Sequence, residues 1–72
     1  MQAPSIIHYL GQSFTDHTVT FAINGVRWEY WLTFNGCQAV DYLAHRISAG
    51  KAFAYAKRHS VKAERVPYAQ SQ

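Results

Sequence analysis

The alternation of apolar and polar residues from Thr18 to Thr33 is the clearest pattern in the chain, and it predicts a β-hairpin. Asn24-Gly25 lies at its centre and favours a two-residue type I′ turn. Because side chains alternate between the faces of a strand, this turn places six apolar residues on one face: Val19, Phe21, Ile23, Val26, Trp28 and Tyr30. The mostly polar remainder occupies the other face: Thr18, Thr20, Ala22, Arg27, Glu29 and Trp31. A lone hairpin is only marginally stable in water, so we expect other elements to cover the apolar face.

Two further segments have the composition of strands. Ser5–Leu10 is rich in β-branched and aromatic residues and predicts a first strand, with Gly11–Asp16 as the connection to the hairpin. Together these strands form a three-stranded antiparallel meander. Val61–Val66 is a candidate fourth strand at the edge, where Pro67 would limit further pairing.

Two helices are predicted after the hairpin. Apolar residues at helical spacing (Val40, Leu43, Ala44 and Ile47) indicate an amphipathic helix over about 37–47, with Thr33 and Asn35 as alternative N-caps. The alanine-rich segment Lys51–His59 predicts a second helix, which Ser48 could cap. The expected fold is therefore α+β, a small antiparallel sheet with both helices packed on one face. The predicted core is Val19, Phe21, Ile23, Trp28, Tyr30, Val40, Leu43, Ile47 and Phe53.

Length and composition indicate one small domain. The chain has 72 residues, of which 49% are hydrophobic and 15% charged, so disorder is unexpected outside the termini at 1–4 and 69–72. Its single cysteine, Cys37, excludes an intramolecular disulfide and favours a reducing, cytoplasmic setting. No apolar stretch is long enough for a membrane span, and no signal peptide is expected.

Charge is distributed unevenly along the chain. Residues 1–45 carry one basic and three acidic residues, a net charge of −2, whereas residues 46–72 carry six basic and one acidic, a net charge of +5. This segregation suggests an anionic partner, RNA or DNA, although a solvated surface would look the same. The candidate phosphate contacts are Arg46, Lys51, Lys57, Arg58, Lys62 and Arg65. Two aromatic residues could add contacts: Tyr55 lies among the basic residues, and Trp31 lies on the polar face of the hairpin as a stacking platform or a protein-binding hot spot.

Catalytic and cofactor motifs are not expected. Gly50-Lys51 lacks the upstream glycine, the following Ser or Thr and the preceding strand of a phosphate-binding loop. The four histidines form no paired spacing of a helical metal site. Cys37 has no base that can be placed beside it and is interpreted as a small buried residue. We therefore predict a protein that is not an enzyme and that needs no cofactor or metal.

Several short motifs occur in the order and spacing of a known family. They are Val19-Thr20-Phe21, Asn24-Gly25, Trp28-Glu29-Tyr30, Val40-Asp41-Tyr42-Leu43 and Ser48-Ala49-Gly50-Lys51-Ala52-Phe53. Over residues 9–60 the chain resembles the KTSC domain, a small domain found at the C-terminus of lysyl-tRNA synthetases and also as free-standing proteins. It departs from the family at Phe34-Asn35-Gly36, where Val-Pro is usual, and at Ala54, where Asn is usual. The resemblance implies the α+β fold and an association with RNA.

Three functional hypotheses follow from these features. The first is a non-enzymatic nucleic-acid-binding module, with RNA favoured over DNA. The alternative is a small phage-type inhibitor, such as an anti-CRISPR protein, that binds a host nucleoprotein complex or another protein target stoichiometrically. The third is a homodimeric module that pairs through a sheet edge or Trp31.

Overall fold

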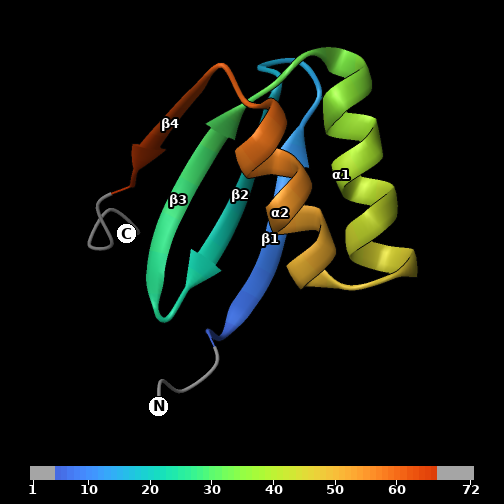
Figure 1. Ribbon diagram of the computed structural model, residues 1–72. Coiled ribbons are helices and arrows are strands. Elements are labelled where there is room, and N and C mark those ends of the chain that lie inside the picture. Colours follow the sequence, from blue (N-terminus) through green and yellow to red (C-terminus); the bar gives the residue numbers. More distant parts are fainter. Residues whose placement is uncertain (1–4, 67–72) are drawn as a thin grey trace.

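The sheet and both helices expected from the sequence are present in the computed structural model, which describes residues 5–66 (Figure 1). The elements in chain order are β1 (Ile7–Ser13), β2 (Thr18–Ile23), β3 (Val26–Trp31), α1 (Phe34–Arg46), α2 (Ala49–His59) and β4 (Lys62–Arg65). The strands form one antiparallel sheet in the order β1-β2-β3-β4. The α+β class is confirmed, and the C-terminal segment supplies the fourth strand. The termini expected to fray lie outside the described residues.

The β2–β3 hairpin has the predicted register. Ile23 pairs with Val26 and Phe21 with Trp28. Asn24 and Gly25 have positive φ angles of 51° and 87°, as a type I′ turn requires. Asn24 also exchanges two hydrogen bonds of 2.8 Å with Ile6, one through its backbone N–H and one through its side-chain oxygen. The turn therefore also fixes the chain just before β1.

Strand β1 lies later in the sequence than predicted. It was expected over Ser5–Leu10, with Gly11 opening a connection, but it runs from Ile7 to Ser13. The pairing with β2 shifts by one residue between Tyr9 and Gly11, which is a β-bulge. Gly11 has a φ of +136°, a conformation that favours glycine, and this lets the strand continue beyond the bulge.

Both helices begin at a hydroxyl cap. Helix α1 starts at Phe34, one turn before the predicted Cys37, because the Thr33 side chain accepts a hydrogen bond of 3.0 Å from the Gly36 N–H. In α2, the Ser48 side chain accepts a bond of 3.1 Å from the Lys51 N–H, so this helix starts at Ala49. Ser48 thus caps α2 as the sequence suggested.

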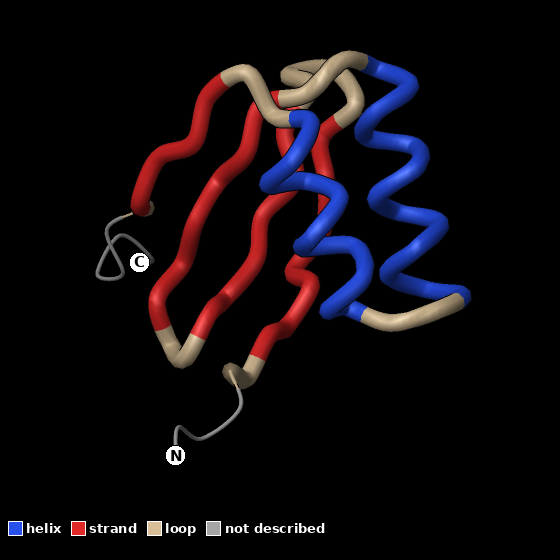
Figure 2. The backbone as a smooth tube through the Cα atoms, viewed as in Figure 1, coloured by secondary structure: helices blue, strands red, loops and turns tan. Residues whose placement is uncertain are grey.

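The helices cover one face of the sheet and only part of its width. They lie over β1 and β2, while β3 and β4 extend beyond them (Figures 1 and 2). The opposite face of the sheet carries no helix. Neither helix among the described residues is long and apolar enough to cross a membrane.

The core lies between the helices and the centre of the sheet. Its buried residues are Val19, Phe21, Tyr30, Leu32, Cys37, Val40, Ala52 and Ala56. Four predicted core residues are only partly buried and pack against these: Ile23, Trp28, Leu43 and Phe53. Ile47 is wrong as a core residue, because α1 ends at Arg46 and the Ile47 side chain is 53% exposed.

Candidate nucleic-acid interface

Helix α2 presents three basic side chains to solvent. Lys51 and Arg58 are seven residues apart, about two helical turns, so they lie along the same side of the helix. Lys57 lies beside them, and its Nζ is 5.3 Å from the centroid of the Phe53 ring, within the range of a cation–π contact. All three side chains are exposed because the opposite side of α2 packs on the sheet through Ala52 and Ala56.

An open hollow lies on the outer side of α2, lined by Phe53, Ala54, Lys57 and Arg58. Its aromatic residue is held rigidly by the core. The Phe53 ring meets Phe21 edge-on at 5.5 Å and lies nearly perpendicular to the Tyr30 ring at 5.9 Å. A partly exposed aromatic ring with fixed orientation thus lies next to two cationic side chains.

The uncovered half of the sheet adds a fourth cation on the same side of the molecule. Arg65 of β4 pairs with Trp28 of β3, and Trp28 in turn pairs with the buried Phe21. Residues that pair directly point to the same face, so Arg65 and Trp28 project on the side of the sheet that carries the helices. We call Lys51, Lys57, Arg58 and Arg65 the basic face.

Trp31 and Lys62 lie on the opposite side of the sheet. They pair with each other across β3 and β4, and the Lys62 Nζ is 4.8 Å from the Trp31 ring. The same Nζ is 3.5 Å from Glu64 Oε2. Glu29 faces Glu64 in the same layer, so basic and acidic residues alternate here. The structure therefore separates these two predicted site residues from the basic face.

The remaining two predicted site residues occupy other positions. Arg46 is exposed in the last turn of α1. Tyr55 is partly buried against the core, and its ring stacks on His59 of the next turn with 4.2 Å between centroids. Tyr55 therefore packs partly against the core, and its role in binding stays a prediction.

Ion pairing leaves the basic face unneutralised. Within residues 5–66, carboxylates pair only with His45 and Lys62. No acidic group of this segment is within ion-pair distance of Lys51, Lys57, Arg58 or Arg65. These cations therefore remain available to an anionic ligand.

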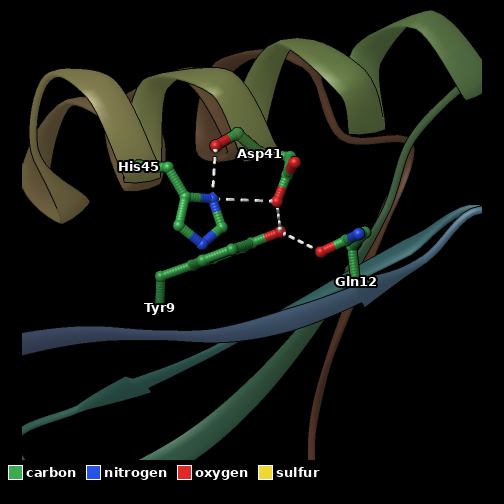
Figure 3. Close-up of polar contacts among 4 residues, drawn as sticks. All are labelled: Tyr9, Gln12, Asp41 and His45. Atoms are coloured by element: carbon green, nitrogen blue, oxygen red, sulfur yellow. Dashed lines mark hydrogen bonds and ion pairs between the residues drawn. The ribbon is translucent and has the colours of Figure 1, made fainter.

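A polar cluster between β1 and α1 was not predicted as a unit (Figure 3). The Tyr9 hydroxyl is 3.0 Å from Asp41 Oδ1 and 2.6 Å from Gln12 Oε1. His45 Nδ1 is 3.1 Å from the same Asp41 oxygen. The i, i+4 spacing of Asp41 and His45 is a signal that the sequence carries, because side chains four residues apart meet on one side of a helix. Tyr9 is 32 residues before Asp41 in the chain, so its contact with Asp41 could not be predicted without the fold.

The Tyr9 hydroxyl joins β1 to α1 in this cluster. Burial, with Asp41 as the second cause, raises the pKa of Tyr9, so the hydroxyl remains protonated and donates to the carboxylate. Cys37 of α1 is fully buried on the side of the helix that faces the core, and burial raises the pKa of its thiol, which opposes a role as a nucleophile. The described residues contain no group of three or more potential metal ligands.

Comparisons with protein-family models, with curated proteins and with solved structures found no match to this chain. The resemblance to the KTSC domain therefore stays a prediction.

Proposed function

We propose that this chain is a non-enzymatic module that binds nucleic acid, preferring single-stranded RNA, through α2 and the neighbouring uncovered part of the sheet. The observation that carries the proposal is the basic face, whose four cations have no acidic partner among the described residues. Lys57 and Arg58 line a hollow with Phe53, and Arg65 pairs with Trp28. This combination of separated positive charges with partly exposed rings is typical of surfaces that follow a phosphate backbone and stack bases.

The two kinds of side chain would have different roles. Lysine and arginine side chains contact phosphates, and this part of the affinity depends strongly on salt. Phe53 and Trp28 offer ring surface to bases, a contribution that is less sensitive to salt and tolerant of sequence. RNA is favoured over DNA by the resemblance described above. The expected ligand is therefore a single strand recognised with little sequence preference.

The test is the affinity of the protein for a fluorescein-labelled single-stranded RNA, measured by anisotropy at several salt concentrations. If the four cations of the basic face each contact a phosphate, the slope of log K against log salt should be about −2.8. Lys57→Ala together with Arg58→Ala should weaken binding at low salt and flatten this slope by about 1.4.

A matched pair of substitutions controls for total charge. Arg27→Ala together with Lys62→Ala removes the same two positive charges from the opposite face of the sheet, and we expect it to leave RNA binding nearly unchanged. Equal weakening by both pairs would contradict binding at α2. Absence of binding to RNA and to single-stranded DNA at low salt would contradict the function itself.

Trp31 supports a second candidate, a stoichiometric inhibitor that binds a protein of a host nucleoprotein complex. Trp31 is only partly buried, and the strand register places it on the face of the sheet opposite the two described helices. Aromatic anchors of this kind account for about 2 kcal/mol or more at protein interfaces, with little dependence on salt. Recovery of one host protein at a fixed ratio, abolished by Trp31→Ala but not by the α2 substitutions, would favour this candidate over RNA binding.

A further inference from the structure

We propose that a second copy of this chain pairs antiparallel with β4, producing a two-fold symmetric dimer with a continuous eight-stranded sheet. Strand β4 is at the edge of the sheet, and all four of its residues are exposed. An edge strand presents unpaired backbone groups that can accept another strand. This inference concerns self-association and does not depend on the ligand proposed above.

The hydrogen-bond phase of β4 shows which backbone groups are available. The Val66 N–H donates to the Arg27 carbonyl at 2.9 Å, so residue 66 directs its backbone groups toward β3. In an antiparallel ladder this direction alternates from one residue to the next. The backbone N–H and C=O groups of Lys62 and Glu64 therefore also point toward β3, while those of Ala63 and Arg65 point away from it.

Charge selects one register for the pairing. In a symmetric antiparallel pair, the residue on the two-fold axis faces its own copy. Lys62, Glu64 or Arg65 on the axis would place like charges opposite each other, which is unfavourable. With Ala63 on the axis, each Lys62 would face Glu64 of the partner subunit, and the outward backbone groups of Ala63 would form the central pair of hydrogen bonds.

The arrangement of the layers permits this approach. A two-fold axis perpendicular to the sheet places the helices of both copies on the same side. In each copy the helices lie over β1 and β2 and leave β4 uncovered, so they do not collide at the new strand pair (Figure 2). Ala63 projects into this uncovered region, where its small side chain lets the two strands meet closely. Because four-residue strands bury little surface, we expect association to depend strongly on concentration.

The experiment measures the mass of the full-length protein by sedimentation equilibrium from about 10 µM to about 1 mM, a range suited to weak association. The unsubstituted chain should show a monomer–dimer equilibrium. Lys62→Glu and Glu64→Lys should each weaken dimerisation about tenfold or more, because two attractive contacts become repulsive. Lys51→Glu makes the same charge change as Lys62→Glu, but on α2, and should leave the monomer–dimer equilibrium unchanged.

Restoring the charges separates the proposed register from general effects. The two variants mixed together have opposite charges at both contacts and should form a heterodimer. The single chain that carries both Lys62→Glu and Glu64→Lys should form a homodimer for the same reason. Amide hydrogen exchange should show protection of Ala63 that rises with protein concentration. A monomer throughout the range, or a dimer unaffected by the single substitutions, would overturn the proposal. Dimerisation of the charge-restored proteins would show that the single variants lose dimerisation through charge repulsion and not through misfolding.

Discussion

Tyr9 is the residue through which the sheet holds α1 by a polar contact. Its hydroxyl reaches Asp41 on the helix, its ring meets His45 edge-on at 5.5 Å, and it lies on the same face of the sheet as the buried Phe21. A tyrosine hydroxyl has one proton to donate. Two acceptors lie within reach of it, Asp41 Oδ1 and Gln12 Oε1, and Asp41 is the stronger one because it carries a negative charge.

This contact predicts a dependence of stability on alkaline pH. The folded-state pKa of Tyr9 lies above its ordinary value of 10.0, mainly because of burial and then because of Asp41. The stabilisation is therefore complete below about pH 10 and is lost as the pH rises toward the folded-state pKa. Tyr9→Phe should lower the free energy of unfolding by about 1 kcal/mol at pH 7 and make its decline above pH 10 shallower. Urea denaturation of both proteins at pH 7 and pH 10.5 measures this; an equally steep decline would contradict it.

At single positions, the sequence predicted burial best where neighbouring strands enforce it. Val19, Phe21 and Tyr30 are buried because the turn at Asn24-Gly25 leaves only one register. Ile47 continued the apolar spacing of α1 but lies past the last helical residue, so its direction is no longer set by helical geometry. Periodicity alone could not show where the helix stops.

Among the elements, α2 depends most on its cap. It has 11 residues, a length at which an isolated helix is marginal, and its N-terminal N–H groups need a partner. The hairpin could be predicted because its turn and alternation are local signals. The bulge in β1 could not, since it depends on how Gln12 pairs with Val19 after the extra residue.

Removing the cap should destabilise the protein without changing its fold. Ser48→Ala leaves the Lys51 N–H without its acceptor and should cost about 1 kcal/mol in the free energy of unfolding. Ser60→Ala is the matched control at the other end of α2, where the cap contributes its backbone N–H to Ala56, and it should change stability by less than about 0.5 kcal/mol. Urea denaturation followed by circular dichroism compares the two. Equal losses of stability in the two variants would contradict a specific role for the Ser48 hydroxyl as the cap.

For the whole molecule, the sequence predicted the charge segregation but not its division between two faces. Lys62 and Arg65 are three residues apart in one strand, so they point to opposite sides of the sheet. The position of the helices over β1 and β2 was also beyond prediction. The small buried side chains of Ala52 and Ala56 allow α2 to approach the sheet closely. From the sequence alone, these alanines indicate only that the segment is helical.

The rate at which a thiol reagent modifies the buried cysteine measures how often α1 separates from the sheet. Cys37 has no exposed surface and is the only thiol in the chain, so a reagent such as Ellman's can modify it only after α1 separates from the sheet. The native protein should react at least about a thousandfold more slowly than the protein in denaturant, given the stability usual for small domains. Ser48→Ala should speed the reaction about fivefold if α1 and α2 open together, and leave it unchanged if α1 opens alone. Rapid modification of the native protein would instead show that α1 separates readily from the sheet, so a single thiol distinguishes one cooperative unit from two.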